Sequence, residues 1–130
     1  MALTVVWKGG MQFCAETKSG ALTCDESSAE GVLGPSAPEM LLASLGSCIA
    51  SVIVVFGERH GLQLEGMSVR LDYKLADNPY RMGEISIAVH VPQRLTEEQR
   101  RLLERVADAC LIHNTLLHPP KITFHLGGTT

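Results

Sequence analysis

The sequence predicts an α+β fold in which a long apolar helix lies among antiparallel strands. Three observations lead to this prediction. Residues 40–57 are almost entirely uncharged and apolar, short segments with alternating apolar residues precede and follow them, and an amphipathic segment comes near the C-terminus. Because a chain of 130 residues has the usual size of one domain, we expect a single domain over residues 1–130.

The N-terminal part has the pattern of a small antiparallel sheet. Two short apolar segments flank the glycine pair Gly9 and Gly10, which is typical of a hairpin turn. A third short strand is expected next, followed by a polar loop that ends at Gly34. The segments concerned are Leu3–Trp7, Met11–Ala15, Ala21–Cys24 and the loop Asp25–Gly34.

The central helix is expected to begin after Ser36 and to run to about Glu58. Ser36 and Glu39 have the spacing of a capping box, in which the two side chains bond each other's backbone N–H groups. Apolar residues cover almost every face of this helix, so we expect protein on all its sides. A membrane span is the alternative, but serines dilute the segment, and a helix buried in a dimer explains the pattern better.

The second half should add a hairpin, a helix and a last strand. Residues Leu62–Ala76 and Ile85–Val91 alternate like half-buried strands, and Asp77–Pro79 supplies turn residues between them. A capping box opens a second helix, which we expect over Thr96–His113. The alternation in Ile122–Leu126 predicts a final strand.

The charge distribution argues against nucleic acid as a partner. The formal net charge is −3, and the arginines are scattered except for Arg100, Arg101 and Arg105 on one helix. Residues Met1–Trp7 lack the pattern of a signal peptide. We therefore expect a cytoplasmic protein that binds neither nucleic acid nor a membrane.

The four cysteines are the candidates for chemistry. Without an export signal we expect reduced thiols, and the absence of a CxxC pair argues against a structural metal site, so no metal or cofactor is expected. Cys48 lies on the central helix beside small residues, and Cys110 lies on the inner face of the second helix. Each could equally be a small buried hydrophobe, the role that we assign to Cys14 and Cys24.

Two separated motifs distinguish Cys48 and Cys110 from the other cysteines. The segment Pro38–Cys48, PEMLLASLGSC, and the segment Cys110–Leu116, CLIHNTL, resemble the two signatures of the OsmC/Ohr family. The turn Asn78–Arg81 and the order of helices and strands match as well. The resemblance implies an OsmC-like α+β fold, in which a long buried central helix and a second helix pack with antiparallel sheets in an intertwined homodimer.

The resemblance also implies roles for individual residues. Cys48 would attack a hydroperoxide and Cys110 would resolve the sulfenic acid into a disulfide, which an external dithiol then reduces. The family typically activates its thiol with an early arginine held by a glutamate. Glu39 would be that catalytic glutamate, but no arginine precedes Arg59.

Two residues are assigned to the substrate by the same reasoning. Arg81 is the preferred substitute for the missing cation because of its place in the turn, and Leu45 is expected in the apolar wall of the substrate site. His113 is either a base for Cys110 or a hydrogen-bonded structural residue, because it lies one turn away on the same predicted helix.

The leading hypothesis is a dimeric thiol peroxidase that reduces organic hydroperoxides and defends against oxidative stress. The first alternative is an OsmC-like protein without peroxidase activity that serves as a binding or redox-sensing module, which the missing arginine favours. The second alternative is an acyl thioesterase of the hotdog type with Glu39 as its acid. The predicted helix over Thr96–His113 argues against it, because a hotdog domain would continue with strands.

Overall fold

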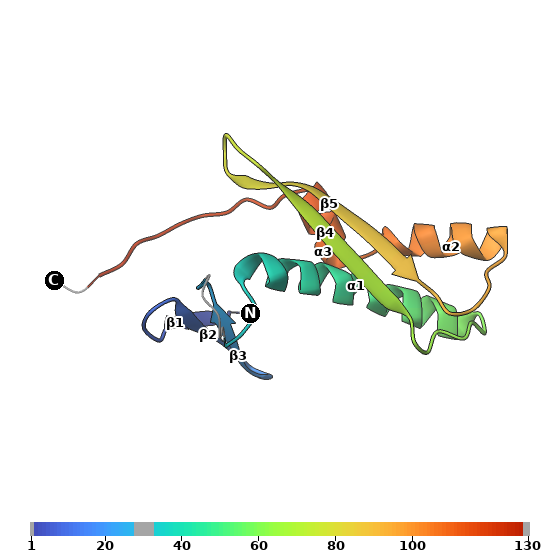
Figure 1. Cartoon of the computed structure of the whole chain (residues 1–130), viewed down its shortest axis with the longest axis horizontal. Coiled ribbons are helices and arrows are strands. Elements are labelled where there is room, and N and C mark those ends of the chain that lie inside the picture. Colours follow the sequence, from blue (N-terminus) through green and yellow to red (C-terminus); the bar gives the residue numbers. More distant parts are fainter. Residues whose placement is uncertain (1, 28–32, 129–130) are drawn as a thin grey trace. The chain divides into compact units, whose positions relative to one another are not determined.

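The computed structural model describes residues 2–27 and 33–128, which divide into two compact units, Met1–Ser44 and Leu45–Thr130 (Figure 1). The division falls inside the long helix α1, Ala37–Arg59. Strands and helices are both present and the strand pairs are antiparallel, so the predicted α+β class is confirmed. That the whole chain forms one domain stays a prediction.

The first unit contains the predicted three-stranded sheet. Its strands are β1, Thr4–Trp7, β2, Gln12–Thr17, and β3, Gly20–Asp25, in the order β1-β2-β3. Gly9 and Gly10 form the first turn with φ angles of 99° and 57°, which only glycine adopts readily. Part of the predicted loop Asp25–Gly34 lies outside the described residues.

The beginning of α1 is fixed by the predicted capping box. The Ser36 Oγ accepts from the Glu39 N–H at 3.3 Å, and Glu39 Oε1 accepts from the Ser36 N–H at 3.1 Å and from its hydroxyl at 2.9 Å. These bonds lower the pKa of the Glu39 carboxyl below its ordinary value, the backbone bond most. The negative charge also suits the first turn of a helix.

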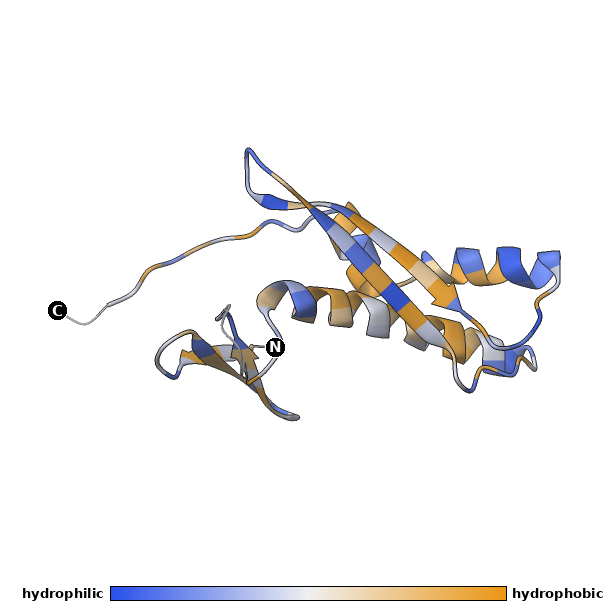
Figure 2. Cartoon of the chain, viewed as in Figure 1, coloured by the Kyte–Doolittle hydropathy of each residue, from blue (hydrophilic) through white to orange (hydrophobic). Residues whose placement is uncertain are grey.

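The second unit packs a hairpin and two helices against the rest of α1. Strands β4, Ser68–Ala76, and β5, Arg81–His90, pair antiparallel, from Ser68 with His90 at one end to Ala76 with Arg81 at the other. The helices are α2, Glu97–Ala107, and α3, Leu111–Leu117. Figure 2 shows that apolar and polar residues alternate along the two strands, as the sequence predicts.

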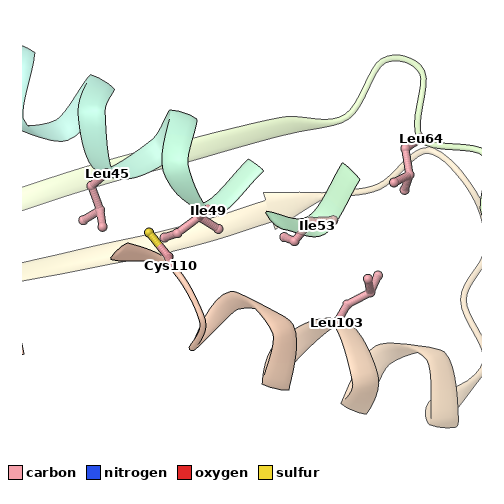
Figure 3. Close-up of a cluster of buried hydrophobic side chains, with 6 residues drawn as sticks. All are labelled: Leu45, Ile49, Ile53, Leu64, Leu103 and Cys110. Carbon is pink, nitrogen blue, oxygen red and sulfur yellow. The ribbon is translucent and has the colours of Figure 1, made fainter. Parts of the chain in front are cut away.

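The core of this unit is a cluster of side chains from α1, α2 and the segments beside them (Figure 3). The approach of α1 to β4 is close, because a Cβ added at Gly46 would lie 2.7 Å from Leu71 Cδ1. A larger residue at position 46 would therefore have to displace the end of the Leu71 side chain. The cluster consists of Leu45, Ile49, Ile53, Leu64, Leu103 and Cys110.

Within residues 2–27 and 33–128, protein does not cover every side of α1, contrary to the prediction. The buried residues form one stripe along the helix, while Leu41 and Val55 are 37% and 50% exposed. Among the described residues, α1 is the one helix long and apolar enough to cross a membrane by length and composition. Core helices of soluble proteins meet the same criteria. Leu45, Ile49 and Ile53 of the buried stripe belong to the core cluster of Figure 3.

The prediction of one helix over Thr96–His113 is wrong, because the structure has two helices there. The capping box at Thr96 is present, but α2 ends at Ala107 and the chain turns through Asp108 and Ala109. Cys110 has an extended backbone and is the N-cap of α3.

The predicted strand Ile122–Leu126 is not formed among the described residues. Figure 1 draws the segment after α3 as an extended tail, and Ile122, Phe124 and Leu126 are 85%, 88% and 82% exposed. The alternation of apolar residues is that of a strand, but a strand needs a partner for its backbone hydrogen bonds, and this chain does not supply one within the described part.

Candidate active site

The site is formed by the thiols of Cys48 and Cys110, which lie far apart in the sequence of the second unit. Cys48 is half-buried on α1, one helical turn from the buried Leu45. Cys110 is fully buried in the core cluster and precedes α3. Cys110 lies close enough to lower the pKa of Cys48, so the fold brings together the pair that the sequence singles out.

The N-terminus of α3 meets both sulfur atoms. The first backbone N–H groups of a helix have no partner within the helix and are therefore free to donate. The His113 N–H donates to Cys110 Sγ at 3.4 Å, while the N–H groups of Ile112 and Leu111 lower the pKa of the Cys48 thiol. The first turn of α3 therefore acts on both thiols.

This arrangement shifts the pKa values of the two thiols in opposite directions. The hydrogen bond from Cys110, then the Ile112 N–H and the Leu111 N–H, lower the pKa of Cys48 below its ordinary value against a cost of burial. Burial, then the hydrogen bond with Cys48 and its charge, raise the pKa of Cys110. Cys48 is therefore the thiol that ionises more readily, and Cys110 keeps its proton more firmly beside it.

The lowered pKa of Cys48 has an uncharged origin. Its causes are a thiol and two backbone N–H groups, and none of them is a lysine or an arginine in the part of the chain that the structure describes. Cys48 lies too far along α1 to benefit from that helix's own N-terminus, whose effect is confined to about the first turn. The first turn of α3 supplies the partial positive charge instead.

The remaining residues predicted from the sequence have other contacts. Arg81 Nη1 donates to the carbonyl oxygens of Asp77 and Pro79, both at 2.9 Å, and so closes the tip of the β4-β5 hairpin. Leu45 is 2% exposed and packs in the core cluster. Glu39 bonds Ser36 as a capping residue. The substrate and catalytic roles of these three residues stay predictions.

Sequence reasoning missed Leu111 and Ile112. Their contribution comes from backbone N–H groups, which every residue except proline carries, so side-chain types give no signal for it. The signal would have been a helix start after Cys110, since a cysteine that accepts from the N–H three residues later acts like a serine cap. The run of helical spacing through residues 102–113 concealed that start.

The described residues offer no metal site. Within 2–27 and 33–128, no three His, Cys, Asp or Glu side chains gather where they could hold an ion. The four cysteines are free thiols. The chemistry that Cys48 and Cys110 support is that of a thiolate with a second thiol beside it.

Comparison with known proteins agrees with this fold. No curated protein matches the sequence. A protein of Psychrobacter arcticus, named for osmotic stress induction and detoxification, shares 20% identity over 88% of this chain and 87% of its own, with a TM-score of 0.77. An OsmC-like protein from Mycoplasma pneumoniae shares 18% identity over 91% of this chain and 87% of its own, with a TM-score of 0.77.

A third structure carries a functional name. An organic hydroperoxide resistance protein OsmC from Legionella pneumophila shares 20% identity over 89% of each chain, with a TM-score of 0.63. These structures show the α+β fold with a long central helix and antiparallel sheets. The sequence itself matches the OsmC family of OsmC-like proteins over residues 28–125, which is well over half of the chain. The chain therefore belongs to the OsmC-like protein family.

Proposed function

We propose that this protein is a thiol-dependent peroxidase that reduces organic hydroperoxides in the cytoplasm. The observation that carries the proposal is the contact between two thiols with opposite pKa shifts, lowered for Cys48 and raised for Cys110. The OsmC-like family includes proteins named for hydroperoxide resistance, such as the Legionella pneumophila protein.

The first step uses the Cys48 thiolate. The sulfur attacks the terminal oxygen of the hydroperoxide, the O–O bond breaks, and the alcohol leaves after taking a proton from solvent. Cys48 becomes a sulfenic acid. The half-buried position of Cys48 leaves the sulfur open to a small molecule, while the N–H groups of Leu111 and Ile112 favour the charged form before attack.

The second step uses Cys110. The Cys110 sulfur attacks the sulfenic sulfur of Cys48, a disulfide forms, and the hydroxyl leaves as water with the Cys110 proton. Besides burial, the hydrogen bond with Cys48 and the Cys48 charge raise the pKa of Cys110. The first step removes that charge, so oxidation of Cys48 itself makes Cys110 easier to deprotonate. An external dithiol then reduces the disulfide and is oxidised in turn.

The working form in this proposal is a homodimer. Three observations support it: one face of α1 is uncovered, the outer side of α3 exposes Leu111 and Leu117 at 72% and 62%, and the tail exposes an alternating apolar row. A second copy would cover these surfaces and give the tail a strand to pair with. Phe124→Asp should convert a dimer to a monomer in sedimentation experiments, with Ser19→Asp in the exposed β2-β3 turn as the control.

The test of the activity is a reaction of the reduced protein with one equivalent of cumene hydroperoxide. Rapid loss of peroxide, loss of two thiols, and a mapped disulfide between Cys48 and Cys110 are expected. Persistence of all four thiols would leave the fold intact and overturn the peroxidase. In that case the alternative of a redox-sensing or binding module without peroxidase activity would take its place.

The catalytic role predicted for Glu39 has its own test. Glutamine keeps an oxygen that can accept from Ser36, so Glu39→Gln should preserve most of the capping box while removing the charge. A fall of tenfold or more in the first-step rate, with little change in the melting temperature, is the result that supports a catalytic carboxylate. An unchanged rate restricts Glu39 to capping.

A further inference from the structure

A hollow lies in the same unit, and its lining residue His113 donates its backbone N–H to Cys110 Sγ. It lies between α1, β5 and α2, is partly open to solvent, and has a volume of about 360 Å³. This volume falls in the range of small-molecule sites, and more than doubles the roughly 150 Å³ at which an apolar cavity already binds benzene. Neither Cys48 nor Cys110 lines it. Its walls include Ile49, Ile53, Ile87, Val89 and Leu103.

The walls of this cavity combine buried core side chains with side chains that are partly exposed. Figure 3 shows Ile53 on α1 and Leu103 on α2, which come from the two sides of the core. Val89 of β5 is 39% exposed although it lines the cavity, so its side chain is not covered by the chain itself. An apolar ligand would remove this surface from water.

One polar group in the lining lacks a partner. His113 lines the cavity, and its Nδ1 is a buried ring nitrogen without a hydrogen bond among the described residues. The Nδ1 atom itself is covered from solvent, so a ligand in the cavity bonds it after the imidazole ring rotates about its Cβ–Cγ bond. A buried polar atom without a partner costs about 1–3 kcal/mol, and a ligand that bonds it would recover that cost.

The charges at the cavity select against an anion. Glu104, Asp108 and Arg100 line it, which gives an excess of one negative charge, and none of the three is in an ion pair within the described part of the chain. A carboxylate placed near His113 would meet two like charges. A neutral molecule with a hydroxyl group avoids that repulsion and can still bond a ring nitrogen.

We propose that this cavity binds a small neutral amphipathic molecule of the class of medium-chain alcohols. The apolar chain lies against Ile53, Ile87 and Leu103, and the hydroxyl group bonds His113 Nδ1. This inference does not depend on the peroxidase activity, because it uses neither sulfur. It adds a binding site to the protein rather than a catalytic residue to the thiol pair.

The test is calorimetric titration of the full-length, reduced protein with 1-octanol, with octanoate as the anionic comparison. Saturable binding of 1-octanol, and binding of octanoate at least about tenfold weaker, are expected. His113→Leu should weaken 1-octanol about tenfold, since it removes the hydrogen bond but keeps an apolar side chain of similar shape. The exposed neighbour Asn114→Ala is the matched control and should bind like the original protein.

Two further measurements locate the bound molecule. Nuclear Overhauser contacts from the octanol chain to the methyl groups of Ile53 and Ile87 are expected, and Ala107→Phe should abolish binding by filling the cavity. Absence of saturable 1-octanol binding, or a cavity already closed by a second copy, would overturn the proposal. Equal affinity of His113→Leu, or tighter binding of octanoate, would overturn the assigned ligand class.

Discussion

The four cysteines form two pairs that differ in almost every respect. Cys14 and Cys24 are close in sequence and lie on the paired strands β2 and β3, yet they sit opposite Thr23 and Phe13, not opposite each other. Adjacent strand positions point to opposite faces of a sheet, so these two thiols face apart. Cys48 and Cys110 are distant in sequence, yet they lie close enough for each to shift the pKa of the other.

The surroundings of the two pairs differ in the same way. Cys24 is 5% exposed, and its thiol donates a hydrogen bond to Met40 Sδ at 3.3 Å. A thioether is only a weak hydrogen-bond acceptor and cannot deprotonate the thiol. Cys48 instead has a second thiol and two backbone N–H groups as partners. The comparison indicates that paired chemistry depends on tertiary contacts and on free N–H groups, while nearness in sequence contributes little.

The largest expected effect comes from Cys48→Ser. A serine hydroxyl is not ionised at neutral pH and is a far weaker nucleophile than a thiolate, so the first-step rate with cumene hydroperoxide should fall by at least about a thousandfold. Stopped-flow consumption of peroxide measures it. Cys14→Ser is the matched control and should stay within about twofold. Equal losses in both variants would remove the distinction between the pairs.

Cys110→Ser should separate the first turnover from the following ones. Serine is a favourable N-cap, so α3 should still form and Cys48 should still be oxidised once. Turnover with a dithiol should then fall by about a hundredfold, because no intramolecular disulfide can form. A dimedone adduct on Cys48, detected by mass spectrometry, is the expected product. Steady turnover equal to that of the original protein would contradict the resolving role.

The pH dependence of alkylation tests the origin of the lowered pKa. Iodoacetamide reacts with thiolate, so its rate with Cys48 rises with pH through the pKa, and the lowered pKa places that rise below the pH of an ordinary thiol. Cys110→Ala removes the largest cause of the shift and should move the rise to higher pH. Cys110→Ser retains a hydroxyl donor and should move it less. A rise at the same pH in Cys110→Ala as in the original protein would assign the shift to the α3 N–H groups alone.

Packing beneath Cys48 gives a smaller effect, on stability. The Cβ of Gly46→Ala would lie 2.7 Å from Leu71 Cδ1, and displacing that side chain should outweigh the roughly 0.5–1 kcal/mol that alanine gains over glycine in a helix, so the free energy of unfolding should fall by about 1 kcal/mol. The exposed neighbour Ser47→Ala should change it by less than about 0.5 kcal/mol. Urea titration measures both. No loss in Gly46→Ala would mean that Leu71 moves aside freely.

The same comparison explains what could be predicted from the sequence. The strands β1–β3, helix α1 and the β4-β5 hairpin have strong local patterns, such as the glycine pair at Gly9 and Gly10 and the capping box at Ser36 and Glu39, and the structure confirms them. The roles of Cys48 and Cys110 came from a family resemblance, because no local pattern shows that two distant thiols touch.

The failures share a physical cause. The break before α3 depends on Cys110 Sγ accepting from the His113 N–H, and helical spacing of apolar residues continues across it. The tail Ile122–Leu126 has a strand pattern but no partner in the described chain. The unpartnered Nδ1 of His113 depends on how α2 and β5 pack. Each feature is decided by a tertiary contact, which a one-dimensional pattern does not contain.

The smallest expected effect concerns Cys24, of the pair Cys14 and Cys24. It is the sharpest check of the difference between this pair and the pair Cys48 and Cys110. Cys24→Ala removes a small buried side chain and its contact with Met40, so the free energy of unfolding should fall by about 1 kcal/mol. Peroxide turnover should stay within about twofold, because Cys24 has no second thiol beside it on its face of the sheet. A tenfold fall in turnover at unchanged stability would place Cys24 in the chemistry, and the two pairs could no longer be treated as structural and reactive.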